Sequence, residues 1–229
     1  MRSLRFALAA AAMIATTAFA APNAPVQGVD YMTLATPQAA QTVGKKIEVI
    51  EFFAYHCGAC NAFEPTLHAW VQKNKDNVNF KRIHYPFTGP ADPEAHLFLT
   101  LEAMGKAEEY GPKVFRAFHV ERQRLLKDDV IIDWAVKNGL DKTKFMAAWN
   151  SFGVLTKLKR LPTIVGNYKV DSTPTLVVDG RFSTSPSVVG EGNKGLGNAQ
   201  VVQGVMQVVD HLVATAQKEK GLAGAKPAK

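Results

Sequence analysis

The chain has 229 residues, of which 47% are apolar and 21% are charged, and its formal net charge is +7. A chain of this length buries a sizeable core without covalent staples, so its two cysteines are not needed to stabilise a miniature fold. The basic residues form no long block and no recognition motif accompanies them, which argues against a nucleic-acid-binding protein.

Residues 1–20 have the pattern of a secretory signal peptide. Arg2 and Arg5 precede an apolar stretch of about a dozen residues, and the sequence AFA at 18–20 is a small-x-small cleavage signature. The apolar stretch is shorter than the roughly 20 residues that span a bilayer, so an uncleaved anchor is only the alternative. We expect cleavage at the end of this range.

The next segments predict a strand, a helix and a second strand, after a possible edge strand at 29–34. The range 45–55 (KKIEVIEFFAY) is rich in isoleucine, valine and aromatic residues, as central strands are. From Gly58 to about Asn74 the apolar residues share one side of a helix, which Pro65 is expected to kink. The range 78–87 alternates like a strand, so these elements predict a right-handed crossover with parallel pairing.

From Asp92 to about Asn167 the pattern is helical only. Apolar residues recur three to four positions apart, and glycines and acidic residues mark the ends of each segment. The predicted helices lie within 92–105, 107–121, 128–139, 141–153 and 154–166.

Strand character returns at 173–184, where Asp179-Gly180 between two apolar runs is a strong hairpin signal. A last helix is expected over 198–218, and residues 219–229 are expected to form a flexible tail. The sequence therefore predicts an α/β sheet domain that is interrupted by an all-helical insertion.

Both cysteines lie in EFFAYHCGACNA, residues 51–62, where the predicted strand ends and the predicted helix begins. Residues three apart on a helix have Cβ atoms about 5 to 6 Å apart, near what a disulfide tolerates. A bridge with so short a loop stabilises little, which favours redox chemistry over a structural role. Cys57 is the expected attacking thiol, because the unpaired N–H groups and positive dipole of a helix N-terminus favour a thiolate. Cys60, one turn further, is the expected buried resolving thiol.

Other uses of a cysteine pair fit the sequence less well. A structural zinc site needs about four ligands, and the six histidines show no matching spacing. A covalent haem site needs histidine directly after the second cysteine, but position 61 is asparagine. We therefore expect no metal and no cofactor other than the redox-active disulfide Cys57–Cys60, with an inert structural disulfide as the alternative.

The segment VIEFFAYHCGACNAFEP, residues 49–65, resembles the active-site segment of DsbA-type thiol:disulfide oxidoreductases of bacterial periplasms. The signal peptide, the helical insertion and the late segment TPTLVVDG agree with that family in their order. The likeness extends from about Pro25 to Lys218 and implies a thioredoxin fold with an inserted all-helical domain. The implied domains are a thioredoxin-like domain of residues 21–90 and 168–218 and a helical insertion of residues 91–167.

The resemblance also assigns residues around the thiols. Cys57 takes the family's nucleophile position and Cys60 the resolving position. Thr173-Pro174 matches the cis-proline loop that faces the active-site disulfide and lends backbone groups to an extended substrate peptide. The alternative is an ordinary trans proline that opens an edge strand.

Two acidic residues match family positions that help to move the proton of the buried cysteine, Glu51 and Glu64. Glu51 lies in an apolar strand, where desolvation should raise its pKa, and Arg82 on the next strand is its expected partner. The alternatives are that Glu51 points to solvent at the strand end and that Glu64 is a surface helix residue.

The chain departs from the family pattern beside the thiols. The family commonly has Pro-His between the cysteines, where this chain has Gly58-Ala59, and frequently has valine in place of Thr173. The missing histidine removes a group that stabilises the thiolate, so we expect a higher Cys57 pKa and a less oxidising disulfide than in the strongest oxidases. His56 either compensates in part or is a partly exposed linker residue. Threonine before the proline is also frequent in thiol isomerases of related fold.

The resemblance implies a monomeric periplasmic dithiol oxidase. A substrate thiol attacks Cys57, a mixed disulfide forms, and the substrate's second thiol releases the reduced enzyme. The implied partners are unfolded secreted proteins with free thiols and a quinone-linked inner-membrane protein of the DsbB type that reoxidises the enzyme. A reductase or isomerase, and a peptide-binding chaperone with a structural bridge, are the alternatives.

Overall fold

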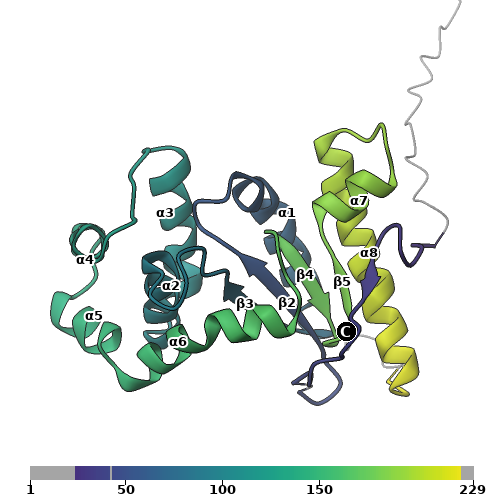
Figure 1. Cartoon of the computed structure of the whole chain (residues 1–229), viewed down its shortest axis with the longest axis horizontal. Helices are drawn as coiled ribbons and strands as arrows, with labels where there is room; N and C mark the ends of the chain where they lie inside the picture. Colours follow the sequence, from purple (N-terminus) through teal and green to yellow (C-terminus); the bar gives the residue numbers. More distant parts are fainter. Residues whose placement is uncertain (1–23, 42, 223–229) are drawn as a thin grey trace, which may run out of the picture.

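A five-stranded sheet organises the computed structural model, which describes residues 24–41 and 43–222. The predicted signal peptide, residues 1–20, lies outside the described residues, as do residues 223–229 of the predicted tail. Helices α2 to α6 form one body beside the β3 edge, and α7 and α8 lie toward the other edge (Figure 1). Among the described residues, no helix has the length and apolar character needed to cross a membrane.

The strand order is β1-β5-β4-β2-β3, with β2 parallel to β3 and antiparallel to β4. The parallel pair joined by α1 is the crossover that the sequence predicts. The strands are β1 (Met32–Thr33), β2 (Ile47–Phe53), β3 (Val78–His84), β4 (Thr175–Val178) and β5 (Phe182–Thr184). The helices are α1 (Gly58–Asn74), α2 (Pro93–Ala103), α3 (Ala107–His119), α4 (Asp128–Lys137), α5 (Lys142–Trp149), α6 (Phe152–Asn167), α7 (Pro186–Gly192) and α8 (Asn198–Glu219).

Strand β2 is buried along its whole length, so both of its faces contribute to the core. Ile47 and Val49 join the cluster formed with α1 and α8. Ile50 and Phe52 point to the opposite face and join a cluster with the end of α6. Because side chains alternate along a strand, Glu51 falls on the same face as Val49, beneath α1.

The hairpin between β4 and β5 follows the Asp-Gly signal. Asp179 and Gly180 have φ values of 53° and 64°, the left-handed region that this turn chemistry favours. A Cβ atom at Gly180 would lie 2.2 Å from the backbone oxygen of Gln38, so glycine is required by space as well as by conformation.

The helical insertion, α2 to α6, shares one hydrophobic cluster with the end of β2 and with Cys60. Side chains of Asp92, Asp141 and Ser151 accept backbone N–H bonds at the starts of α2, α5 and α6, which satisfies donors that a helix end leaves unpaired. Trp134 and Trp149 are buried in this core. Other members of the core include Leu97, Leu101, Val114, Leu125, Ile131 and Phe145.

The structure differs from the sequence predictions in three places. The edge strand expected at 29–34 is limited to Met32–Thr33, and α8 continues through Glu219, the first residue of the predicted tail. Helix α7 was not predicted. Its start carries an ordinary signal, a Ser185 cap followed by proline, but seven residues with two glycines are too few to show a helical period.

Candidate active site

The two cysteines lie at the N-terminus of α1, directly after the turn that follows β2. Cys57 is the N-cap residue, and its Sγ accepts a hydrogen bond from the backbone N–H of Cys60 at 3.3 Å. Both thiols are free in this structure; Cys57 is partly exposed and Cys60 is buried. The strand-to-helix junction therefore presents one thiol to solvent and encloses the other.

The surroundings of the pair separate the two pKa values. A hydrogen bond from the Cys60 thiol, opposed by partial burial, lowers the pKa of Cys57 to about 5, and the Thr173 side chain and two backbone N–H groups lower it as well. The shared hydrogen bond and burial raise the pKa of Cys60 far above its usual range. At neutral pH the negative charge thus belongs to Cys57 and the remaining proton to Cys60.

The loop before β4 faces the exposed thiol. The Thr173-Pro174 bond is cis, and the Cys57 Sγ lies 3.4 Å from the backbone oxygen of Thr173. Gly58 and Ala59 are exposed between the cysteines. The fold therefore brings together the predicted active-site loop residues, although 116 positions separate Cys57 from Thr173.

A buried ion-pair triad lies beneath α1. Arg82 donates from Nε to Glu51 Oε2 at 2.8 Å and from Nη2 to Glu64 Oε2 at 2.6 Å. The Glu51 side chain is 1% exposed, and its Oε1 has no hydrogen-bond partner. Burial, opposed by Arg82, raises the pKa of Glu51 to about 7. The alternative of a solvent-facing Glu51 is therefore wrong.

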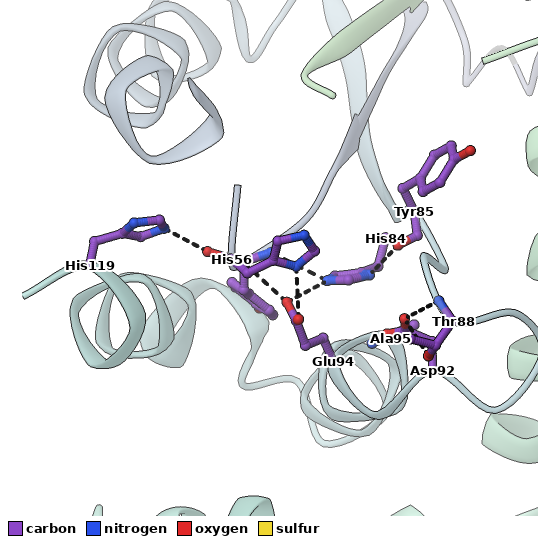
Figure 2. Close-up of polar contacts among 9 residues, drawn as sticks. His56, His84, Tyr85, Thr88, Asp92, Glu94, Ala95 and His119 are labelled. Carbon is purple, nitrogen blue, oxygen red and sulfur yellow. Dashed lines mark hydrogen bonds and ion pairs between the residues drawn. The ribbon is translucent and has the colours of Figure 1, made fainter. Parts of the chain in front are cut away.

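A second polar cluster, which the sequence did not predict, surrounds His56 and Glu94 (Figure 2). His56 is partly exposed, with 38% of its side chain accessible, and it contacts Glu94 of α2 through its backbone N–H and its ring. The backbone N–H of Tyr55 donates to His84 Nε2. His119 Nε2 of α3 donates to the backbone oxygen of Tyr55 at 2.8 Å. In the sequence, Glu94 resembles any acidic residue in the first turn of a helix, so no local signal identifies it.

An exposed aromatic residue, Phe87, packs against His56 beside the thiols. Phe87 is 50% exposed, and its ring meets the His56 ring edge to face at 4.7 Å between centroids. This gives His56, the residue before Cys57, an apolar neighbour that is open to solvent. Within the described ranges, no group of three or more His, Cys, Asp or Glu side chains is placed to hold a metal ion.

Comparison with known proteins agrees with this geometry. A family model described as a DSBA-like thioredoxin domain matches residues 48–201. The chain belongs to this family. As a DsbA-like protein it has a thioredoxin fold with a helical insertion, and it is a thiol:disulfide oxidoreductase that acts on substrate proteins through a cysteine redox centre.

Named relatives of this DsbA-like chain match it over most of their length. It is 35% identical to the thiol:disulfide interchange protein DsbA of Burkholderia cepacia, over 91% of this chain and 93% of that one. It is 36% identical to the protein of the same name from Bordetella parapertussis, over 92% and 96%. The crystal structure of Pseudomonas aeruginosa DsbA superposes with a TM-score of 0.75 at 29% identity, covering 86% of this chain and 97% of that chain.

In this DsbA-like site we expect the Cys57 thiol to titrate near pH 5, because the contacts described above stabilise its thiolate. The ultraviolet absorbance of the thiolate in the reduced protein measures this, and Cys57→Ala should lack the transition. A midpoint near the ordinary cysteine value of about 8.5 would show that these contacts do not act. A midpoint near about 3.5, as in the strongly oxidising DsbA, would contradict the weaker stabilisation expected from Gly58-Ala59.

Proposed function

We propose that this protein introduces disulfide bonds into secreted proteins through the Cys57–Cys60 pair. The observation that supports this most directly is the difference in exposure and pKa between the two thiols. Cys57 caps α1, is open to solvent and has a strongly lowered pKa, whereas Cys60 is enclosed and keeps its proton. A stable thiolate in the reduced state makes the disulfide of the oxidised state a stronger oxidant.

The exchange proceeds in two displacements. A substrate thiolate attacks Sγ of Cys57, the Cys57–Cys60 bond breaks, and Cys60 leaves as a thiolate that takes up a proton. The substrate's second thiolate then attacks the substrate sulfur of the mixed disulfide, and Cys57 leaves as a thiolate. The substrate loses two electrons and the enzyme gains them.

The triad beneath α1 gives Glu51 a role in the first displacement. Its pKa of about 7 means that the carboxyl group both holds and releases a proton near neutral pH. The charge of Glu51 is one of the smaller causes of the raised Cys60 pKa, so the two groups influence each other and the carboxyl is our candidate for supplying the proton that Cys60 takes up as it leaves. Glu64 shares Arg82 with Glu51 and so modulates the charge of the triad.

The signal-peptide pattern and the exposed Phe87 support proposals for the compartment, the substrates and the reoxidising partner. The signal peptide predicted at 1–20 would deliver the protein to the periplasm. There Phe87 and the Thr173-Pro174 loop would receive extended segments of unfolded proteins with free thiols. A DsbB-type, quinone-linked membrane protein would reoxidise the monomeric enzyme.

The reduction potential tests the direction of transfer. The mature protein is equilibrated with glutathione buffers of graded composition, and the fraction oxidised is measured after acid quenching. A potential near about −120 mV, that of the strongly oxidising DsbA, or moderately below it, is the expected result. A potential near about −270 mV, that of thioredoxin, would mean that the disulfide prefers to remain formed, and the protein would then be a reductase.

A further inference from the structure

A buried carboxylate of the helical insertion holds the residue that precedes Cys57. Glu94 Oε2 accepts a hydrogen bond from the backbone N–H of His56 at 3.1 Å, and Glu94 Oε1 pairs with His56 Nδ1 at 2.8 Å (Figure 2). The Glu94 side chain is 4% exposed and that of His56 is 38% exposed. The two contacts together fix both the backbone and the ring of His56.

A neighbouring histidine does not provide the charge that Glu94 needs. His84 Nε2 lies 3.7 Å from Glu94 Oε2, but this nitrogen accepts the Tyr55 N–H at 3.3 Å. His84 Nδ1 lies 3.0 Å from the Tyr85 backbone oxygen and must donate to it. A ring with one accepting and one donating nitrogen is neutral. A cationic partner stabilises a buried carboxylate. Of the two histidines beside Glu94, His56 is the one with a ring nitrogen at hydrogen-bonding distance, 2.8 Å against 3.7 Å for His84.

The charges around His56 favour its imidazolium form. The hydrogen bond to Glu94 raises the pKa of His56 in spite of its partial burial, and the Cys57 thiolate and Asp92 raise it further. Coupling between two ionising groups is reciprocal, so a charged His56 stabilises the Cys57 thiolate by the same amount. The remaining titratable neighbours are His84, whose hydrogen bonds keep it neutral, and His119, which donates to the Tyr55 oxygen.

We propose that Glu94 is a positioning residue for disulfide exchange, which holds His56 as an imidazolium beside Cys57 at neutral pH. The proposal rests on the proposed function, because it explains how the thiolate released from the mixed disulfide is stabilised. His56 acts on the reacting sulfur through its charge, and Glu94 acts only through His56. This gives the helical insertion a direct part in setting the redox properties of the thioredoxin-like domain.

The test measures equilibrium constants with glutathione for the wild type, Glu94→Gln, His56→Gln and the double variant. Free histidine titrates at about 6.5, so the comparison is made at about pH 5.5 and about pH 7. At the higher pH both single variants should be three- to tenfold less oxidising, and tenfold corresponds to about 30 mV for a two-electron couple. At the lower pH His56 holds its proton unaided and Glu94→Gln removes a neighbouring negative charge. Glu94→Gln should therefore be no less oxidising than the wild type, while His56→Gln should still be less oxidising.

The double variant shows whether Glu94 acts through His56. We expect Glu94→Gln to cause no further loss in the His56→Gln background, because the cation is already absent. An additional loss there, an equal loss from Glu94→Gln at both pH values, or no loss at about pH 7 would each overturn the proposal. Glu109→Gln, which alters an exposed carboxylate paired with Lys106 in the same insertion, is the matched control and should change nothing.

Different measurements test this proposal and the proposed function, so the failure of one can be told from the failure of the other. The wild-type potential alone decides between oxidase and reductase, whereas the pH-dependent difference between variants decides the role of Glu94. If Glu94→Gln does not fold, the NMR titration of the His56 ring in the wild type replaces it. A midpoint above about 6.5 is expected, and a midpoint at or below that ordinary value would overturn the proposal.

Discussion

Replacing Cys57 by alanine is expected to abolish disulfide transfer, and replacing Cys60 by alanine is expected to trap the mixed disulfide. Cys57 is the thiol open to solvent, so its removal leaves no sulfur that a substrate can attack. Without Cys60, the Cys57 thiolate that attacks a disulfide of an oxidised substrate forms a mixed disulfide and releases the other substrate sulfur as a thiolate. No enzyme thiol then remains to displace the substrate from Cys57. Free-thiol titration follows the oxidation of a reduced, unfolded two-cysteine substrate by the oxidised wild type and by Cys57→Ala. Denaturing gels without reductant detect the covalent complex that reduced Cys60→Ala forms with a disulfide-containing substrate.

The two variants also separate an oxidase from a chaperone whose bridge is structural. If the protein is a chaperone, both the wild type and Cys57→Ala should suppress the aggregation of the substrate. Neither protein should then oxidise the substrate's thiols. Gln72→Ala, a change at an exposed position of α1, is the control that should leave transfer intact. Covalent complexes formed through Cys60 in the Cys57→Ala variant would show that the roles assigned to the two thiols are reversed.

Those parts of the fold that have local physical causes could be predicted from the sequence. The α1 range, including its start beside Cys57, follows from apolar spacing and from the change of pattern after β2. The Asp179-Gly180 turn follows from the backbone conformations that these two residues tolerate. The prediction of a thioredoxin fold with a helical insertion is confirmed by the family match and by the related crystal structures.

The part of the site that depends on how the insertion sits against the sheet could not be predicted in this way. Glu94 contacts His56 across 38 positions, and His119 contacts Tyr55 across 64. No periodicity or residue spacing in the sequence predicts either contact, because each depends on how α2 and α3 pack against the end of β2. By contrast, Glu51 was identifiable, since a carboxylate within an apolar strand is itself an anomaly.

Replacing Glu51 by glutamine is expected to stabilise the reduced protein at alkaline pH and to slow disulfide exchange. The pKa of Glu51 is raised from 4.5 to about 7. The folded protein therefore binds this proton more tightly than the unfolded chain, and stability falls as the pH rises from 4.5 through 7. At about 1.4 kcal/mol per pKa unit, the ionised carboxylate costs about 3 kcal/mol above that range. Glutamine has a similar shape and never ionises, so it avoids this cost.

Urea unfolding of the reduced proteins across this pH range measures the effect. Wild type and Glu51→Gln should have similar free energies of unfolding near pH 4.5, with the variant more stable above pH 7. Exchange with a model disulfide should slow by about a hundredfold or more, the usual effect of losing a general acid or base. Glu109→Gln, at an exposed ion pair, should leave both quantities unchanged.

The outcome depends on which of two opposing forces on Glu51 is larger. Desolvation favours the neutral carboxyl, whereas Arg82 at 2.8 Å favours the carboxylate. The unpartnered Oε1 and the division of Arg82 between two carboxylates leave the ionised form only partly compensated, so desolvation should prevail. A Glu51→Gln protein that is less stable than the wild type above pH 7 would mean that the ion pair prevails. Glu51 would then stay ionised at neutral pH and could not donate a proton to Cys60.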